Sequence, residues 1–276
     1  ILMQIGEQLQ PGDELYVDIT HSFRSLSIFQ YMMTSFIENL SDRDIRISRI
    51  LYGMLDVARE MGGKVPVVDL TVVNELNHWI KGIYELQHYG NGYLVADLLQ
   101  EQKPELAESI KDLSDRINMN FLKDIRNERR RKLWNGLKNI DGPGNAAASV
   151  MERSLRRFNN NQSEAYFQLN LASWFFEQKR YATGYITLTE AIVTKLCEGN
   201  IIDIDNWNER QKIKNYNIDK DYEYLFGLGK LLQKINEIRK LIAHSQGGSE
   251  NQYHSAVNKC LYYCEQAERA FKRMDL

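Results

Sequence analysis

The amino-acid sequence predicts an α/β domain followed by an all-helical region. Three observations carry this prediction. Short apolar runs with strand character fill the first 70 residues, helical periodicity alone continues after Thr71, and the composition is that of an ordinary globular chain. Of the 276 residues, 43% are hydrophobic and 26% are charged, which predicts neither disorder nor membrane residence. A chain of this length holds roughly two domains.

The first region alternates strands with a helix. We expect a buried strand over 14–20, a helix over 24–39, and strands over 45–54 and 65–70. The apolar stripe of the helix is expected to consist of Leu26, Phe29, Met33, Phe36 and Ile37. Near-continuous apolar runs joined by a helix or a short crossover indicate a parallel sheet, which binds ligands beyond the carboxyl ends of its strands.

Helical patterns alone follow Thr71. The apolar residues of the next helix recur at spacings of three and four; they are Val72, Leu76, Trp79, Ile83 and Leu86. This spacing is typical either of a seam that packs against a helix of a second copy or of an ordinary core-facing stripe. One or two helices over 93–139 end at Asp141-Gly142-Pro143-Gly144, and a polar connection without periodicity is expected over 203–219. Further helices are expected over 146–159, 163–179, 181–198, 221–245 and 250–273.

Charge, hydropathy and cysteine content narrow the classes of protein. The net charge of −2 excludes a uniformly basic nucleic-acid coat, although a local basic groove remains possible. The sequence contains no apolar run of the about 18 to 20 residues that cross a bilayer, and no signal segment opens it, so we expect a cytoplasmic protein. The three cysteines Cys197, Cys260 and Cys264 fit a reducing compartment; with His254 nearby, packing is favoured over a metal site because zinc-type spacing is absent.

The chain begins at Ile1 rather than at Met, and its first expected strand follows almost at once. We therefore expect that the N-terminal part of the first domain lies outside this sequence.

The segment Thr20-His21-Ser22-Phe23-Arg24 joins the first expected strand to its helix and is the first candidate site. A strand that ends in small hydroxyl residues and turns into a helix presents unpaired backbone N–H groups, which attract phosphate. Arg24 falls in the first helical turn, where a cation opposes the helix dipole unless an anion binds nearby. The alternatives are an anion site and an ordinary surface corner.

Arg239 and His244 form an R-x4-H pair near the end of the helix expected over 221–245. A histidine with the ordinary pKa of about 6.5 can exchange a proton with a 2′-hydroxyl or a leaving oxygen, and an arginine can stabilise charge on a pentavalent phosphate. That is the minimum for metal-free RNA cleavage. Because the side chains lie about 140° apart on an ideal helix, they converge only at a distorted helix end or with a second protomer. The alternative is a histidine that contacts the carbonyl end of its own helix.

Other charged and histidine residues are less specific. The basic run over 127–132 is expected to be a solvated helix face rather than an RNA contact, and His78 and His88 are expected to be core or surface histidines.

In their order and surroundings these motifs resemble the CRISPR-associated CARF-HEPN ribonucleases of type III systems. The D-x-T-H-x-x-R motif of the sensor is matched by Asp18, Thr20, His21 and Arg24. A later strand ending in Y-G is matched by Tyr52 and Gly53, and a D-L-T segment with a tryptophan helix by Asp69, Leu70, Thr71 and Trp79. The HEPN motif R-x(4-6)-H is matched by Arg239 and His244, with Lys240 where many members carry Asn or another small polar residue.

The resemblance implies a Rossmann-like CARF sensor and an all-helical HEPN domain. We expect the C-terminal part of the sensor over 1–75, connecting helices over 76–145 and the HEPN domain over 146–276. The resemblance further implies a metal-independent endoribonuclease without a cofactor, which cyclic oligoadenylate activates allosterically to cut single-stranded RNA in type III CRISPR antiviral defence.

The resemblance also implies the two sites and the oligomer. A homodimer or higher homo-oligomer would bind cyclic tetra- or hexa-adenylate across its two-fold axis, with contacts from Asp18, Thr20, His21, Ser22, Arg24, Tyr52 and Gly53. Two Arg239/His244 pairs would form one composite catalytic site, and the cleaved RNA would carry a 2′,3′-cyclic phosphate.

Three other functions stay open at this point. The helical half can be a non-catalytic dimerisation body in a messenger-binding module. The sensor itself can open the cyclic messenger slowly, with help from Thr20 or His21. The chain can also be a nucleotide-binding scaffold without a CRISPR role.

Overall fold

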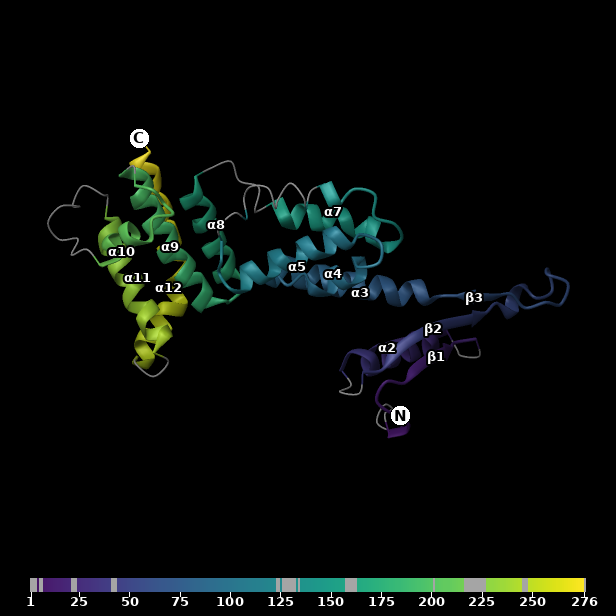
Figure 1. Cartoon of the computed structure of the whole chain (residues 1–276). Helices are drawn as coiled ribbons and strands as arrows, with labels where there is room; N and C mark the ends of the chain where they lie inside the picture. The colour runs from purple at the N-terminus through teal and green to yellow at the C-terminus, as the bar shows by residue number, and fades with distance from the viewer. Residues whose placement is uncertain are drawn as a thin grey trace. The chain divides into compact units, whose positions relative to one another are not determined.

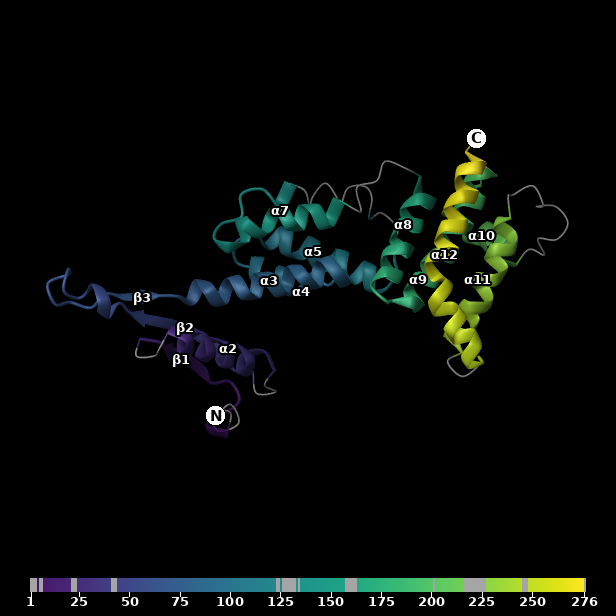
Figure 2. The same ribbon diagram turned by 180° about the vertical axis from the view of Figure 1, so that it is seen from behind.

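The computed structural model (Figure 1) describes residues 4, 7–20, 24–40, 44–122, 125, 133, 135–156, 163–200, 202–215, 227–244 and 248–275. The chain divides into two compact units, one formed by Ile1–Gly82 with Ile140–Ala147 and the other by Ile83–Asn139 with Ala148–Leu276. Figure 2 shows the same ribbon from behind. Among the helices that the structure describes, none has the length and hydropathy that a membrane crossing requires.

The first unit contains a three-stranded sheet and the helix that packs on it. Its elements are β1 (Glu14–Asp18), α2 (Arg24–Leu40), β2 (Arg46–Gly53), the short 3-10 helix η1 (Leu55–Val57), β3 (Val67–Asp69) and the first part of α3 (Thr71–Tyr89). The strand order is β1-β2-β3, with β1 parallel to β2 and β2 antiparallel to β3. The expected mixture of strands and helices is therefore present, in a chain that is mostly helical.

The direction of β3 corrects the prediction of a fully parallel sheet. Between β2 and β3 the chain forms only η1 and turns, and the N–H of Met54 donates to the carbonyl of Pro66 at 2.9 Å. The chain thus returns directly beside β2 without a helix that crosses the sheet. A parallel neighbour needs such a crossover, which here exists only between β1 and β2, where α2 supplies it.

The core of this unit is smaller than the apolar pattern predicts. Met33 and Ile37 of α2 are buried and α2 packs on β2, but Phe29 and Phe36 are 51% and 49% exposed. The side chain of Leu26 lies outside the described residues. A three-stranded sheet covers only one side of the helical stripe. The prediction of a buried first strand is likewise wrong, because Tyr16 of the edge strand β1 is 67% exposed.

Helix α3 buries only part of its predicted apolar stripe. Trp79 is buried in the first unit, and a Cβ atom on Gly144 would lie 2.7 Å from its ring atom Cζ2. Leu86 is buried in the second unit. Val72 and Leu76, by contrast, are exposed. Within the described chain the stripe is therefore buried only in part, and a seam against a second copy stays a prediction.

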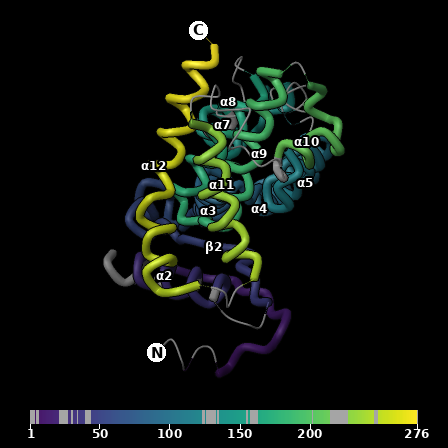
Figure 3. The backbone as a smooth tube through the Cα atoms, turned by 90° about the vertical axis from the view of Figure 1, so that its left-hand side faces the viewer, coloured from purple at the N-terminus to yellow at the C-terminus, as the bar shows by residue number. Residues whose placement is uncertain are grey.

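The second unit contains only helices among the residues that the structure describes. They are the end of α3 with α4 (Tyr93–Leu99), α5 (Pro104–Asn118), most of α7 (Pro143–Leu155), α8 (Glu164–Glu177), α9 (Tyr181–Gly199), α10 (Trp207–Asn215), α11 (Leu228–Ala243) and α12 (Glu250–Met274). Helices α8, α9, α11 and α12 share one apolar core, and α11 and α12 lie side by side in Figure 3. Its large, fully buried side chains include Phe176, Tyr185, Leu188 and Phe271.

Helix α10 corrects the prediction of a structureless connection over 203–219. Its sequence has little apolar periodicity, but Arg210 fixes it to α9. The guanidinium donates to Glu190 Oε2 at 2.7 Å and to Thr194 Oγ1 at 3.0 Å. It also donates to the carbonyl of Ile204 at 3.1 Å. A partly buried ion pair and its hydrogen bonds therefore hold a helix that the hydrophobic pattern alone does not predict.

Candidate functional site

The carboxyl ends of β1 and β2 bring two predicted site segments together. Thr20 Oγ1 accepts a hydrogen bond of 2.7 Å from the N–H of Gly53, and the N–H of Thr20 donates to Asp18 Oδ1 at 2.8 Å. A Cβ atom on Gly53 would lie 2.9 Å from Thr20 Cγ2, so only glycine allows this approach without a shift. Tyr52 precedes Gly53 and is half-buried. Asp18, Thr20, Tyr52 and Gly53 therefore occupy one edge of the sheet.

The remaining predicted residues of this site lie outside the described structure. His21 and Ser22 are among them, and so is the side chain of Arg24, whose backbone begins α2. Their contacts with a phosphate or a ribose stay a prediction. The same holds for the basic run, because residues 127–132 also lie outside the described part of the chain.

The Asp69-Leu70-Thr71 segment fixes the beginning of α3 against β2. Asp69 accepts hydrogen bonds from the N–H of Thr71 at 2.9 Å and from its hydroxyl, and it forms an ion pair with Arg49. Thr71 Oγ1 in turn accepts from the N–H of Ile50 at 3.1 Å. The bonds from Thr71, followed by that from Arg49, lower the pKa of Asp69 to about 2. The segment is thus a structural clasp at the edge where the candidate ligand site lies.

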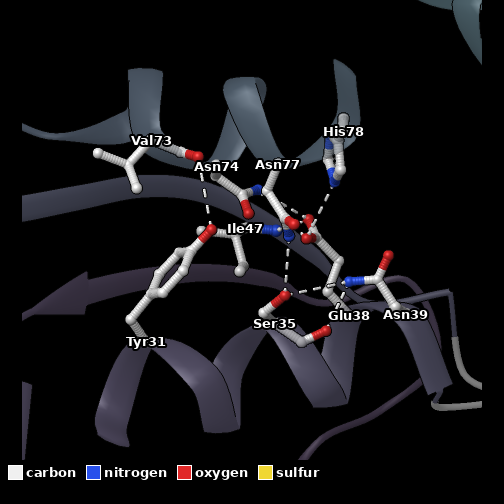
Figure 4. Close-up of polar contacts among 9 residues, drawn as sticks. All are labelled: Tyr31, Ser35, Glu38, Asn39, Ile47, Val73, Asn74, Asn77 and His78. Atoms are coloured by element: carbon white, nitrogen blue, oxygen red, sulfur yellow. Dashed lines mark hydrogen bonds and ion pairs between the residues drawn. The ribbon is translucent and has the colours of Figure 1, made fainter. Parts of the chain in front are cut away.

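A polar cluster between α2 and α3, shown in Figure 4, is a feature that the sequence analysis missed. Glu38 is only 10% exposed and accepts bonds from the N–H of Ile47 at 2.9 Å and from Asn74 Nδ2 at 3.2 Å. His78 Nε2 lies 3.2 Å from Glu38 Oε2. Farther along the same interface, Asn77 Nδ2 donates to Ser35 Oγ at 3.1 Å.

The environment of Glu38 favours its charged form. Burial alone would raise the pKa of this carboxyl, but the hydrogen bonds from His78, Ile47 and Asn74 outweigh burial and lower it. Asn74 Oδ1 is buried and has no hydrogen-bond partner in the described part of the chain. A signal was available in the sequence, since Asn74 and His78 are four residues apart and therefore share a helix face. Their partner Glu38 is 40 residues away from His78 and had no local signature.

The R-x4-H pair lies at the end of α11. Helix α11 ends at Ala243, and His244 follows as the capping residue, with its N–H donating to the carbonyl of Lys240 at 3.0 Å. The side chain of His244 is exposed, whereas Arg239 is half-buried. The histidine thus leaves the regular helix at this point. No hydrogen bond between the two side chains is present within the described structure.

Arg239 has an unusual environment for an arginine. Its Nε atom is buried and lacks a hydrogen-bond partner, and the guanidinium forms no ion pair with the residues that the structure describes. One turn earlier, the buried Oδ1 of Asn236 is also unpartnered within that part of the chain. Lys240 is exposed on the same helix. The end of α11 therefore offers positive charge and an unused N–H donor on Arg239, which suit an anion, whereas the Asn236 oxygen is an acceptor and suits a donor group.

In the part of the chain that the structure describes, the surroundings of the three cysteines and of the histidines His88 and His254 indicate no metal site. Cys197, Cys260 and Cys264 are buried in the helical core, and burial raises the pKa of each thiol. His254 is exposed on α12, and His88 packs its ring 4.3 Å from that of Tyr84. Among the described residues no cluster of three or more His, Cys, Asp or Glu side chains is arranged to hold a metal ion.

Comparison with known proteins finds similarity to a CRISPR-associated protein. Residues 75–166, which include α4, α5, α7 and most of α3, match the family model for the second domain of CRISPR-associated protein MJ1674. The chain is 36% identical over 252 residues to CRISPR-associated protein MJ1674 of Methanocaldococcus jannaschii. This match covers 89% of the chain and 39% of the relative, so the chain spans about two fifths of the relative's length. These similarities support a CRISPR-associated protein.

Proposed function

We propose that this protein is a cyclic oligoadenylate-activated, metal-independent endoribonuclease that cuts single-stranded RNA in type III CRISPR antiviral defence. Its similarity to a CRISPR-associated protein supports the CRISPR setting. The observation that carries the catalytic assignment is the end of α11, where Arg239 has no partner among the described residues and the exposed His244 follows the helix.

The proposed reaction uses the substrate as its own nucleophile. The 2′-oxygen of a ribose attacks the adjacent phosphorus, the bond from phosphorus to the 5′-oxygen breaks, and the products are a 2′,3′-cyclic phosphate and a 5′-hydroxyl. One proton must leave the 2′-hydroxyl and one must reach the 5′-oxygen. His244 transfers one of these protons, and the same histidine of a second copy transfers the other. Arg239 stabilises the charge that develops on the phosphate.

The proposed activator site is the sheet edge at Thr20 and Gly53. Both residues lie at the carboxyl ends of parallel strands, the position at which α/β sheets bind ligands. We assign contacts with the phosphates and riboses of cyclic oligoadenylate to this edge, with His21, Ser22 and Arg24 completing it.

Helix α3 is the proposed link from activator to active site. It begins at Thr71, which is bonded to Asp69 and to Ile50 of the sheet. It ends at Tyr89, whose carbonyl accepts a bond of 2.5 Å from Arg180 Nη1 in the helical unit. One helix therefore contributes residues to both compact units. Activator binding would shift the population of helical-unit states through this helix.

The test is cleavage of a labelled single-stranded RNA in EDTA, with and without cyclic tetra- and hexa-adenylate. The native protein is compared with His244→Ala and Arg239→Ala, and with Lys259→Ala as an exposed basic control on α12. We expect ligand-dependent cutting that loss of His244 or Arg239 reduces by at least about a hundredfold, the lower end of the range for general acid–base catalysis. Cutting that survives His244→Ala in a contaminant-free preparation would refute the assignment.

An alternative function is a messenger-binding module with a non-catalytic helical dimerisation domain. The observation that favours it is Lys240, which stands in the motif where many HEPN sequences carry a small polar residue. In this case calorimetry would detect binding of cyclic tetra- or hexa-adenylate to the native protein, while neither ligand would provoke RNA cutting.

A further inference from the structure

The first turn of α12 presents an exposed aromatic side chain beside the end of α11. Helices α11 and α12 pack against each other (Figure 3), and His244 and Ser249 are five residues apart in the sequence. A Cβ atom on Gly248 would lie 3.6 Å from Leu241 Cδ2 and 3.7 Å from Gln252 Oε1. The beginning of α12 is therefore folded against the last turn of α11, at the same end of the helix pair as Arg239 and His244.

Tyr253 is the aromatic residue of this turn, and it contributes little to the core. The residue is 64% exposed, and its hydroxyl forms no hydrogen bond with the described residues. Its ring pairs with that of His254, with centroids 5.2 Å apart. A ring that is left in water at this position gains nothing for folding.

The backbone that carries Tyr253 is well fixed. Ser249 and Gln252 form a reciprocal capping box, in which the N–H of each residue donates to the side chain of the other, at 2.8 Å and 3.3 Å. The N–H of Tyr253 donates to the carbonyl of Ser249 at 3.1 Å. A ring on a fixed backbone loses little conformational freedom when it packs against a ligand, so it is prepared for binding.

We infer that Tyr253 stacks on an unpaired base of the RNA next to the phosphate that Arg239 and His244 act upon. This inference rests on the proposed ribonuclease function and names the feature that selects its substrate. Every base has a flat face, so an exposed aromatic ring beside a cationic site binds single strands of any sequence. A duplex keeps its bases stacked on one another and offers the ring no partner. Tyr253 thus gives the site its preference for single-stranded over double-stranded RNA.

The first experiment measures RNA binding without catalysis. Fluorescence anisotropy of a fluorescein-labelled, unstructured oligoribonucleotide is recorded for His244→Ala protein, with and without cyclic tetra- or hexa-adenylate. Added to this background, Tyr253→Ala should raise Kd about tenfold, as expected for one lost stacking contact, and Tyr253→Phe should leave Kd unchanged. Tyr262→Ala, which removes a 53% exposed tyrosine from the same helix, is the matched control and should have no effect.

Three results would overturn the inference. The first is a Kd for Tyr253→Ala within a factor of about two of its parent. The second is a loss in Tyr262→Ala as large as that in Tyr253→Ala. The third is an absence of RNA binding by the His244→Ala parent at micromolar protein.

The second experiment separates this inference from the proposed function. An abasic nucleotide is placed at each position around the cut. At one of these positions the missing base should slow cutting by the native protein. The same missing base should cause no further loss in Tyr253→Ala, because its stacking partner is already absent. A variant that had only lost fold stability would not show this position-specific pattern. If His244→Ala still cuts RNA, the catalytic assignment fails while the Kd comparison between native and Tyr253→Ala protein still decides the stacking role. If His244→Ala is inactive and the abasic profiles of native and Tyr253→Ala protein coincide, the stacking role alone fails.

Discussion

Different kinds of interaction stabilise the interior of each of the two compact units. In the helical unit, α8, α9, α11 and α12 bury large apolar side chains in one shared core. In the first unit, the interface between α2 and α3 is built around the carboxylate of Glu38 and its hydrogen bonds. Large apolar residues of these two helices stay exposed there, including Phe29, Met32, Val72 and Ile80.

This difference bears on the proposed response to cyclic oligoadenylate. The hydrophobic effect that holds an apolar core is non-directional, and such a core has no discrete alternative arrangement of donors and acceptors. A hydrogen-bonded interface is directional, so a rearrangement exchanges one set of bonds for another and defines distinct states. The contrast fits a helical unit with one stable core and a first unit whose hydrogen bonds can be exchanged for another set. Three predictions test this difference, beginning with the largest expected effect.

Truncation of the helical core should cause the largest loss of stability. Phe271 is fully buried and meets the ring of Tyr166 edge-on, with centroids 5.4 Å apart. We expect Phe271→Ala to lower the free energy of unfolding by about 3 to 5 kcal/mol, through lost burial and the cavity left behind. Urea denaturation followed by circular dichroism measures the change. Tyr262→Ala on the exposed face of α12 should cost less than about 0.5 kcal/mol, and an equal cost for both variants would contradict the assigned core.

Loss of Glu38 should have the next largest effect, confined to the first unit. Glu38→Ala leaves the N–H of Ile47 and the amide of Asn74 without their acceptor, and buried donors of this kind cost about 1 to 3 kcal/mol each. We expect the opening free energy at the Ile47 amide, measured by hydrogen exchange, to fall by about 2 kcal/mol, while amides of α9 keep their protection. Glu60→Ala, at an exposed site, is the control. A parallel loss in α9 would show that the units do not differ in the way we describe.

Local patterns in the sequence predict much of this fold. The helices α8, α9, α11 and α12 follow from apolar periodicity, because a core-facing stripe repeats every three or four residues. The antiparallel direction of β3 was not predictable in this way, since the apolar run over 67–69 is compatible with either direction. Helix α10 was also missed, because a long-range ion pair between Arg210 and Glu190 stabilises it rather than an apolar stripe.

The candidate sites also combine features that local sequence patterns predict with features that depend on long-range contacts. The spacing of Arg239 and His244 is visible in the sequence, but the lack of a partner for Arg239 among the described residues depends on what surrounds α11 in three dimensions. The contact between Thr20 and Gly53 joins residues 33 apart, and it follows from the parallel pairing of their strands. The polar cluster around Glu38 had no sequence motif, because its members come from α2, β2 and α3.

The smallest expected effect is a pH dependence at the clasp between β3 and α3. The folded pKa of Asp69 is about 2, below the unfolded value of about 3.9. A lowered folded pKa stabilises the protein above the unfolded pKa, and this stabilisation disappears as the pH falls from about 4 to 2. The difference in unfolding free energy between native protein and Asp69→Asn, from urea denaturation, should therefore be constant near neutral pH and shrink within that range. A difference that stays the same from pH 7 to pH 2 would contradict this assignment. The hydroxyl bond from Thr71 is the largest single cause of the shift, so Thr71→Val, which removes that bond and keeps the backbone N–H bond, should reduce the pH-dependent difference more than Arg49→Met does. The reverse order would mean that the ion pair, and not the turn into α3, holds this part of the first unit together.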